Sequence, residues 1–241
     1  MRRQARGRSE RAPGTRGRVL VRSPPRAQRR PTAPLVAPGA VSRSALACKR
    51  LVDLVGASLL LVVMAPVLAV SVCAVRLDSR GPVFFAQRRI GRHGRPFQII
   101  KLRTMVCYSD CDAAELMQQS VEGGWLKLDE DPRITRVGRL LRKTSLDELP
   151  QVFNVLRGEM SLVGPRPLPE ATDRRITGWA RRRGEMRPGL TGMWQVSGRD
   201  NTTFDEMLRL DYEYVATWSL WTDVRVMLRT PAAVLWGRGA G

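Results

Sequence analysis

The sequence predicts an α+β fold that is mostly helical and is held at a membrane by one apolar helix. Three observations carry this prediction: an uncharged apolar run over residues 54–75, a strand–turn–strand pattern within residues 81–105, and helical spacing of apolar residues through most of the rest. We therefore expect a disordered basic tail over residues 1–43, a re-entrant membrane helix over residues 44–80, and a small cytoplasmic domain over residues 81–241. The domain should combine a short β-hairpin with amphipathic interfacial helices.

The tail is defined by its charge. Residues 1–43 hold twelve arginines against one acid, Glu10, so more than half of the chain's net charge of +19 lies here. A segment with this charge and so few apolar residues cannot bury enough surface to fold alone. Because it directly precedes a membrane segment, we expect it to be attracted to anionic lipid. Nucleic-acid binding is the alternative, but the tail offers no aromatic platform on which bases could stack.

The apolar run contains no charged residue and is long enough to cross a hydrocarbon layer of ~30 Å. Pro66 lies near its middle, where proline removes a backbone hydrogen bond and kinks a helix. Both flanks are basic, so a straight span would place one basic flank outside, against the positive-inside tendency. We therefore favour a re-entrant hairpin that breaks at Pro66 over a single span. Asp53, at the entry, is expected to pair with Lys49 or Arg50.

Residues 81–105 predict a β-hairpin, with strand-like runs over 83–86 and 97–102 on either side of a glycine-containing turn. Lys101 and Arg103 are two positions apart, so they should share one face of the second strand. This pair fits either a solvated face or a contact with phosphate, and both interpretations stay open.

The rest of the chain reads as short helices separated by turns. Met193 to Val196 is expected to be a short strand or extended piece, and the tryptophans of this half fit either a membrane interface or an ordinary core. No cysteine forms a CxxC pair and His93 is the only histidine, which argues against a zinc site. The predicted helices are residues 110–120, 134–141, 149–156, 173–185, 203–217 and 219–236, with a loop at 187–192.

The chain is organised around residues 142–167, where two adjacent carboxylates, Asp147 and Glu148, lie between Arg142 and Arg166. Arginine forks grip phosphate oxygens, and carboxylates hold a metal or act as nucleophiles, so this pattern suits a phosphorylated substrate.

The alternative is helix capping. Ser145 and Glu148 fit a capping box, or Asp147 could itself be an N-cap, and on composition alone this is the commoner case. The two interpretations are compatible, because a carboxylate at a helix N-terminus stays ionised.

Several segments resemble those of the bacterial sugar transferases, the monotopic polyprenyl-phosphate phosphoglycosyl transferases of the exopolysaccharide-initiating type. Nearly everything from residue 49 onward is covered, and the motifs taken together are highly specific. The resembling segments are KRLVD (49–53), GPVFFAQRRIG (81–91), KLRTM (101–105), DPRITRVGRLLRKTSLDELPQVFNVLRGEMSLVGPRP (131–167), RPGLTGMWQVSGR (187–199) and DYEYVATWSLWTDVRVMLRT (211–230).

The resemblance implies a reaction. A UDP-sugar gives its sugar-1-phosphate to undecaprenyl (polyprenyl) phosphate, which yields a polyprenyl-diphosphate-sugar and UMP in the first membrane step of exopolysaccharide or glycoconjugate synthesis. It implies that Asp147 is the nucleophile, forming a covalent phosphosugar, and that Glu148 helps to hold Mg²⁺ or to position the acceptor. The candidate phosphate and nucleotide-sugar contacts are Arg142, Arg166, Lys101, Arg103 and Arg199.

The resemblance also implies a location. Residues 81–241 would be the catalytic domain on the cytoplasmic face of the bacterial inner membrane, next to a helix that re-enters at Pro66. No specific nucleic-acid partner is expected. A non-catalytic scaffold of the same fold is the competing hypothesis, and the presence of both carboxylates and both flanking arginines argues against it. Glucose or galactose is the sugar suggested by analogy.

Overall fold

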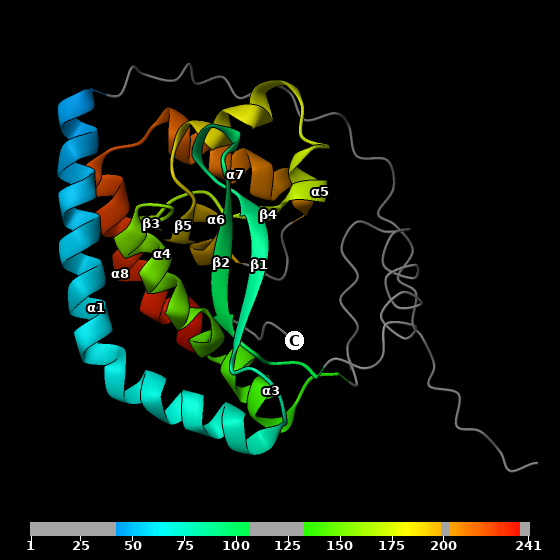
Figure 1. Cartoon of the computed structure of the whole chain (residues 1–241). Coiled ribbons are helices and arrows are strands. Elements are labelled where there is room, and N and C mark those ends of the chain that lie inside the picture. Colours follow the sequence, from blue (N-terminus) through cyan, green and yellow to red (C-terminus); the bar gives the residue numbers. More distant parts are fainter. Residues whose placement is uncertain (1–41, 107–132, 199–202, 237–241) are drawn as a thin grey trace, which may run out of the picture. The chain divides into compact units, whose positions relative to one another are not determined.

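The computed structural model describes residues 42–106, 133–198 and 203–236. Nearly all of the predicted tail and the whole helix predicted over residues 110–120 therefore lie outside the described residues. Within them the chain is mostly helical with a small sheet, which confirms the α+β class (Figure 1). In chain order the elements are α1 (Arg43–Asp78), β1 (Phe84–Ile90), η1 (Arg92–Gly94), β2 (Pro96–Leu102), α3 (Arg136–Lys143), η2 (Leu146–Gln151), α4 (Val152–Arg157), β3 (Ser161–Val163), β4 (Leu168–Pro169), α5 (Glu170–Asp173), η3 (Gly178–Glu185), β5 (Gly189–Thr191), α6 (Met193–Val196), α7 (Phe204–Ala216) and α8 (Leu220–Trp236).

The predicted membrane helix is α1. It begins after Ser42, whose Oγ accepts a hydrogen bond from the backbone N–H of Ala45 at 3.1 Å. Pro66 lies inside it, and Figure 1 shows that α1 bends part-way along its length. Among the described residues, α1 is the one helix long and apolar enough, by length and composition, to cross a membrane. That is compatible with membrane association. Its large exposed apolar side chains are Leu51, Val52, Val55, Leu59, Val62, Val63, Val67, Val70 and Leu77.

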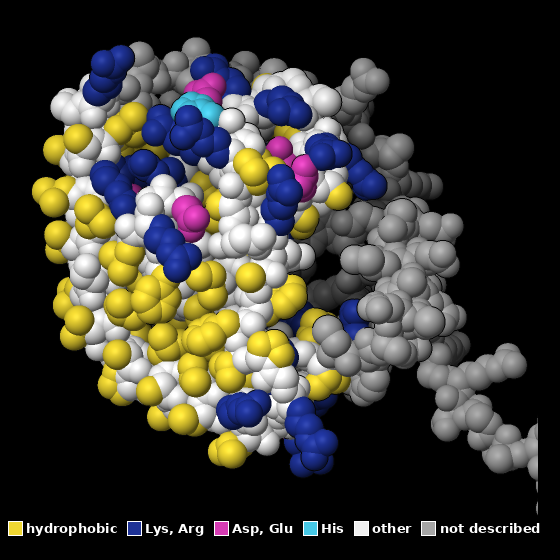
Figure 2. All heavy atoms as spheres, viewed as in Figure 1, with side chains coloured by type: hydrophobic (Ala, Val, Ile, Leu, Met, Phe, Trp, Pro, Cys, Tyr) yellow, Lys and Arg dark blue, Asp and Glu magenta, His cyan; other side chains and the backbone are white. Residues whose placement is uncertain are grey.

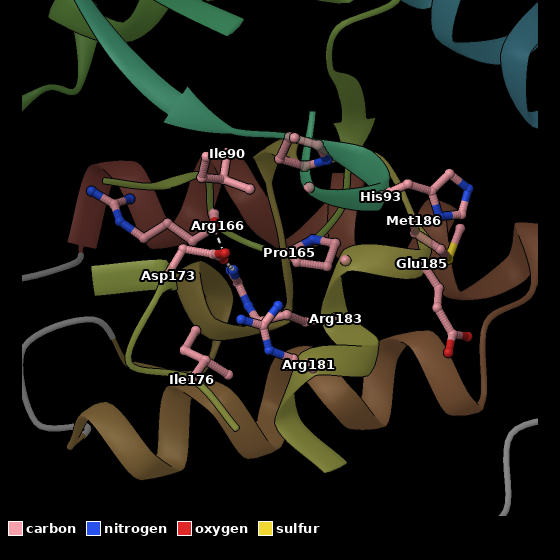
Figure 3. Close-up of a pocket in the computed structure, with 14 residues that line it drawn as sticks. Ile90, His93, Pro165, Arg166, Asp173, Ile176, Arg181, Arg183, Glu185 and Met186 are labelled. Atoms are coloured by element: carbon pink, nitrogen blue, oxygen red, sulfur yellow. Dashed lines mark hydrogen bonds and ion pairs between the residues drawn. The ribbon is translucent and has the colours of Figure 1, made fainter. Parts of the chain in front are cut away.

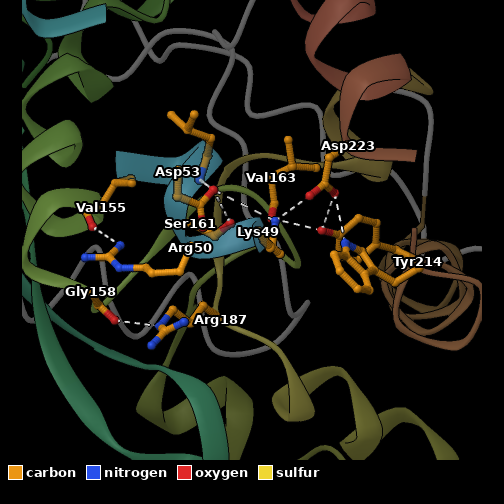
Figure 4. Close-up of polar contacts among 12 residues, drawn as sticks. Lys49, Arg50, Asp53, Val155, Gly158, Ser161, Val163, Arg187, Tyr214 and Asp223 are labelled. Atoms are coloured by element: carbon orange, nitrogen blue, oxygen red, sulfur yellow. Dashed lines mark hydrogen bonds and ion pairs between the residues drawn. The ribbon is translucent and has the colours of Figure 1, made fainter. Parts of the chain in front are cut away.

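A buried ionic network fixes the first part of α1 to the domain (Figure 4). The ammonium of Lys49 donates to Asp223 Oδ2 at 2.6 Å and to the carbonyl of Val163 at 3.0 Å. It also lies 3.9 Å from Asp53 Oδ1, which confirms the expected Lys49–Asp53 pair. Asp53 is buried, and its Oδ1 accepts from the hydroxyl of Ser161 at 2.8 Å. The charges are therefore paired inside the protein rather than at a lipid surface.

A second clamp joins α1 to the end of α4. The guanidinium of Arg50 donates to the carbonyls of Val155 and Leu156 at 2.7 and 2.9 Å, and Arg187 Nε donates to the carbonyl of Gly158 at 2.8 Å. Cations at this position satisfy the free carbonyls and the negative dipole of a helix C-terminus. Gly158 has φ 84°, as expected for the C-cap that follows α4.

The predicted β-hairpin is confirmed. β1 and β2 pair antiparallel, with Phe84 opposite Leu102 and Ile90 opposite Pro96, and η1 forms the turn. β1 runs to Ile90, further than the predicted strand. β4 pairs with the other edge of β1, which brings the segment that follows the turn at 164–167 beside the hairpin. The buried Asn154 of α4 ties that helix to β2, because its Nδ2 donates to the carbonyl of Gln98 at 2.7 Å.

Glycines allow a second pair of segments to approach closely. β3 and β5 pair parallel, and the N–H of Gly164 donates to the carbonyl of Thr191 at 2.9 Å. A Cβ on Gly164 would lie 2.3 Å from the carbonyl oxygen of Arg187, so only glycine fits this crossing. The loop predicted over 187–192 thus contains a strand, β5.

Two predictions in this half were wrong. Residues 193–196 form a helical turn, α6, because Trp194 and Gln195 are both buried by packing that a four-residue pattern does not encode. The helix predicted over 173–185 is interrupted: α5 ends at Asp173, and η3 begins only at Gly178, which has φ 62°.

The remaining helices agree with the sequence. The amphipathic segment before Arg142 forms α3, and the last two predicted helices form α7 and α8. The hydroxyl of Thr203 accepts from the N–H of Glu206 at 3.3 Å and so caps α7. Of the tryptophans, Trp194 is buried in the domain, whereas Trp221 is 59% exposed. Trp194 is therefore a core residue, whereas Trp221 lies at the surface.

Candidate functional site

The two adjacent carboxylates are presented by η2, which follows α3 after a sharp reversal. Ser145 makes the reversal with φ 56°, a left-handed conformation that a non-glycine residue rarely adopts. The side chain of Ser145 forms no capping hydrogen bond, and Asp147 lies inside η2 rather than at its N-cap. Ser145 thus holds the N-cap position with both carboxylates in the first turn, but the predicted side-chain capping bond does not form, and Asp147 is not the N-cap.

Glu148 is the centre of a charge cluster drawn from three segments. Its Oε1 lies 2.6 Å from the ammonium of Lys101 on β2 and 4.0 Å from Nη2 of Arg166, which follows β3. All three side chains are largely buried, with 16% of Glu148, 19% of Lys101 and 27% of Arg166 exposed. The fold thus brings together three residues that the sequence predicted as a site.

Asp147 is half-buried beside this cluster. The pKa of Asp147 is raised from 3.8 to about 6, first by burial and then by the neighbouring charge of Glu148, while Lys101 and Arg142 act in the opposite direction. Arg142 is therefore near enough to influence Asp147 by its charge. The carboxylate stays ionised at neutral pH, but it binds a proton more readily than an ordinary aspartate does. A carboxylate of raised basicity is a better nucleophile than an exposed one.

Arg166 is held from both ends. Its guanidinium lies 4.9 Å from the centre of the Trp194 ring, and its backbone carbonyl accepts a hydrogen bond from Nη2 of Arg183. Arg183 is buried, and its Nη2 also lies 2.8 Å from Asp211 Oδ2. A stacked, backbone-anchored arginine loses little side-chain entropy when it binds an anion.

Arg89 is a further cation that the sequence did not single out. Its guanidinium donates to the carbonyl of Pro167 at 3.3 Å and to Oε1 of Gln87 at 2.5 Å. Burial, and then the charge of Arg166, lower the pKa of Arg89 to about 10, so it remains cationic at neutral pH. The signal that could have found it is the alternation along β1, which places Arg89 on the same face as Gln87.

These groups surround one pocket. Glu148 lines it, whereas Asp147, its neighbour in the chain, does not. The cationic and carboxylate groups share the pocket with apolar side chains and with two amides. Its lining residues are Arg89, Ile99, Lys101, Glu148, Gln151, Arg166, Pro167, Gly189, Leu190 and Gln195.

Two predicted phosphate contacts are not part of this cluster. The Nη2 of Arg103 donates to the carbonyl and the hydroxyl of Ser79 at 2.7 and 2.9 Å, which places Arg103 at the C-terminal end of α1. Arg199 lies outside the described residues. Lys101 and Arg103 therefore have different partners, Glu148 and Ser79, although both lie at the C-terminal end of β2 and alternation predicts one face for them.

A second cleft, of about 260 Å³, adjoins the first (Figure 3). It lies between the β1–β2 turn, with His93, and the 3₁₀ helix η3, with Arg181 and Arg183. Arg166 borders both hollows. Because Arg183 is already paired with Asp211 and with Asp173 at 3.7 Å, its charge is largely used within the protein.

The sequence matches the family profile described as "Bacterial sugar transferase" over residues 44–237. It is 43% identical over 199 residues to "Galactosyl transferase CpsE" of Streptococcus agalactiae, which covers 82% of this chain and 44% of the relative. It is 46% identical over 196 residues to "UDP-glucose:undecaprenyl-phosphate glucose-1-phosphate transferase" of Caulobacter vibrioides, covering 78% and 69%. With "Exopolysaccharide production protein ExoY" of Rhizobium meliloti it shares 39% over 207 residues, covering 84% and 92%. The chain thus spans less than half of the first relative and most of the last.

Proposed function

The chain belongs to the bacterial sugar transferase family, and on that basis we propose that it transfers sugar-1-phosphate from a UDP-sugar to a polyprenyl phosphate such as undecaprenyl phosphate. The printed name of the Caulobacter relative describes this reaction for UDP-glucose, and other relatives are named for galactose transfer. The observation that carries the proposal is the pair of adjacent carboxylates in η2 set against the buried cations Lys101, Arg166 and Arg89.

The proposed reaction has two displacements at one phosphorus atom. A carboxylate oxygen of Asp147 attacks the β-phosphorus of the UDP-sugar, and the bond from that phosphorus to the oxygen bridging the two phosphates breaks. UMP leaves with the bridging oxygen, and the sugar phosphate remains on Asp147. An oxygen of the polyprenyl phosphate then attacks the same phosphorus, the bond to Asp147 breaks, and the carboxylate is restored. A covalent step lets one site serve a soluble donor and a lipid acceptor in turn.

The cations of the site explain why an anion could attack a phosphate here. Negative charge on the phosphate oxygens opposes the approach of a carboxylate, so fixed positive groups must neutralise it. Arg166 and Arg89 are both held by backbone contacts, and Lys101 is held against Glu148. In this proposal Arg142, at the end of α3, supplies a further charge beside Asp147. Glu148 orients Lys101 and thereby sets where the phosphate binds.

In this proposal Mg²⁺ would be held by the two carboxylates of the site, Asp147 and Glu148. No group of three or more histidine, cysteine or acidic side chains that could hold a metal occurs among residues 42–106, 133–198 and 203–236. Asp147 and Glu148 offer two adjacent carboxylates, which is the usual protein share when substrate phosphates and water complete the shell of Mg²⁺. In this role the ion would neutralise phosphate charge.

For the membrane we propose that α1 re-enters at its bend near Pro66 and leaves the domain on the cytoplasmic face of the inner membrane. Figure 2 shows apolar side chains gathered along the α1 side and lower part of one face, with lysines and arginines above and below them. The buried anchor at Lys49 fixes the helix to the domain. A helix held in this way keeps the site at the height of a lipid phosphate, which is a proximity effect.

The test follows UMP release from a panel of UDP-sugars in membranes that contain the full chain, Mg²⁺ and undecaprenyl phosphate. The native chain should release UMP with one sugar, and Asp147→Asn should reduce the rate by roughly a thousandfold or more, as loss of a nucleophile does. Glu206→Gln, which changes an exposed carboxylate of α7, is the matched control and should keep native activity. Native activity in Asp147→Asn would exclude this residue as the nucleophile.

A further inference from the structure

The pocket beside Glu148 contains buried polar atoms that the protein itself leaves unpaired. Within the described residues, six buried side-chain nitrogen and oxygen atoms have no hydrogen-bond partner, and three of them belong to residues that line this pocket. They are Nε of Arg89, Nε2 of Gln151 and Oε1 of Gln195. Buried polar groups in folded proteins are nearly always hydrogen-bonded to the protein, to ordered water or to a ligand, so three in one pocket mark a place where water or a group of a bound molecule pairs with them.

The fold aims the two amides at one place. Gln151 follows Glu148 by three positions in the 3₁₀ helix η2, where side chains three apart eclipse one another. Gln195 comes from α6 and directly follows Trp194, whose ring packs against the guanidinium of Arg166. Both glutamines are almost fully buried, with 2% of Gln151 and 3% of Gln195 exposed. They therefore adjoin the charged groups from two sides of the same pocket.

Besides Nε of the cationic Arg89, the unpaired atoms are a donor on Gln151 and an acceptor on Gln195, and these two amides carry no net charge. An ionised phosphate oxygen has no proton at neutral pH, so it can accept from the amide of Gln151 but cannot donate to the oxygen of Gln195. A hydroxyl group both donates and accepts, which matches both amides. The neutral amides are thus suited to an alcohol that lies next to a bound phosphate.

We infer that Gln151 and Gln195 bind hydroxyl groups of the sugar that is transferred and help to select that sugar. This inference rests on the proposed function. The amides border Glu148, whose neighbour Asp147 would attack the β-phosphorus, and the sugar is bonded directly to that phosphate. The nucleoside is separated from it by a second phosphate. Neutral polar groups next to the reacting phosphate therefore contact the sugar rather than the nucleoside.

The experiment compares donors that each lack one sugar hydroxyl with the parent UDP-sugar, in the native full chain and in Gln195→Leu and Gln151→Leu. Removal of a recognised hydroxyl should lower the native kcat/KM by about 10- to 100-fold, because a buried amide is then left unpaired. Each leucine variant should lose a similar factor on the parent donor. For each leucine variant, removal of the hydroxyl that the glutamine binds should cause no further fall in kcat/KM. Removal of any other hydroxyl should lower kcat/KM as much as it does in the native chain.

Controls separate recognition from folding. Gln98→Leu makes the same change at an exposed position of β2 and should keep native selectivity. Gln195→Met and Gln151→Met keep the length of the side chain and replace the leucine variants if those unfold. The inference would be overturned if the loss from each leucine variant and the loss from each missing hydroxyl simply multiplied for every analogue. It would also be overturned if the variants lost their effect only when cytosine replaced uracil in the donor. If the native chain releases no UMP from any donor, the proposed function fails and the inference falls with it.

Discussion

The guanidinium of Arg166 stacks on the indole of Trp194, 4.9 Å from the ring centre, while the backbone carbonyl of Arg166 is held by the buried Arg183. Both supports come from segments far away in sequence. Together they hold a half-buried cation whose ion pair with Glu148 is long, at 4.0 Å. The charge of Arg166 is therefore available to an incoming phosphate.

Loss of the ring should weaken catalysis. We expect Trp194→Leu to lower kcat/KM for UMP release by about 3- to 30-fold, because a cation over an aromatic ring is stabilised by roughly 0.5–2 kcal/mol. Trp194→Phe keeps an aromatic face and should recover part of the loss. Kinetics should be measured well below the unfolding temperature of each variant. A phenylalanine variant no better than the leucine variant would show that packing, rather than the ring face, positions Arg166.

The pH dependence of the reaction should report Asp147. Its pKa is raised to about 6, so activity should fall on the acid side as this carboxylate becomes protonated. The charge of Lys101 lowers that pKa, so Lys101→Met should move the acid limb of the kcat/KM profile to higher pH as well as reduce the rate. Lys143→Met, an exposed lysine on α3, is the control and should leave the limb in place. An acid limb that does not move in Lys101→Met would contradict the placement of this charge beside Asp147.

The ionised carboxylate of Asp147 should also destabilise the folded chain at neutral pH. Its pKa is higher in the folded chain than its ordinary value of 3.8, so the folded state binds the proton more tightly. The free energy of unfolding therefore falls as pH rises from about 4 to about 6 and stays lowered above that range. A difference between 3.8 and about 6 corresponds to roughly 3 kcal/mol at most. Asp147→Asn should raise the unfolding temperature at neutral pH, and the gain should vanish below about pH 4.

The stability measurement should be made on the full chain in detergent or nanodiscs, without added Mg²⁺, so that only the protein's own charges act on Asp147. An asparagine variant that is less stable than the native chain at neutral pH would mean that the carboxylate makes favourable contacts that outweigh its burial.

The glycine crossing between β3 and β5 should tolerate no side chain. A Cβ on Gly189 would lie 2.1 Å from the nitrogen of Gly164 and 2.2 Å from the carbonyl oxygen of Thr191. We expect Gly189→Ala to lower the free energy of unfolding by about 2–4 kcal/mol, at or above the usual cost of overpacking, because backbone atoms cannot move aside. Gly184→Ala meets no atom within 4 Å and is the matched control. Thermal unfolding of the two variants decides this, and equal unfolding temperatures would refute the tight crossing.

Much of the fold could be predicted because its signals are local. The alternation in residues 81–105 specified the β1–β2 hairpin, and Gly158 marked the end of α4. Adjacent acids between basic residues pointed to Asp147 and Glu148. Alternation was enough to place Lys101 on the correct face, but Arg103 lies beyond the end of β2 and turns to Ser79 instead.

The rest depended on contacts between distant segments. Gln151, Gln195 and Arg89 come from three separate segments of the sequence, and they become notable as a group only because the fold buries them in one pocket. Trp194 likewise shows its role only once Arg166 is seen against its ring. α6 was misread as extended because its four residues are buried by neighbours that the sequence does not reveal.

The most direct measurement is covalent labelling of the full chain by a UDP-sugar that carries radioactive phosphorus in its β-phosphate, with no polyprenyl phosphate present. The native chain should bind label in an amount equal to the UMP released and should discharge it when undecaprenyl phosphate is added. Asp147→Asn should bind none. Turnover by the native chain without any labelled protein, or equal labelling of Asp147→Asn, would contradict the proposed role of Asp147 as the nucleophile.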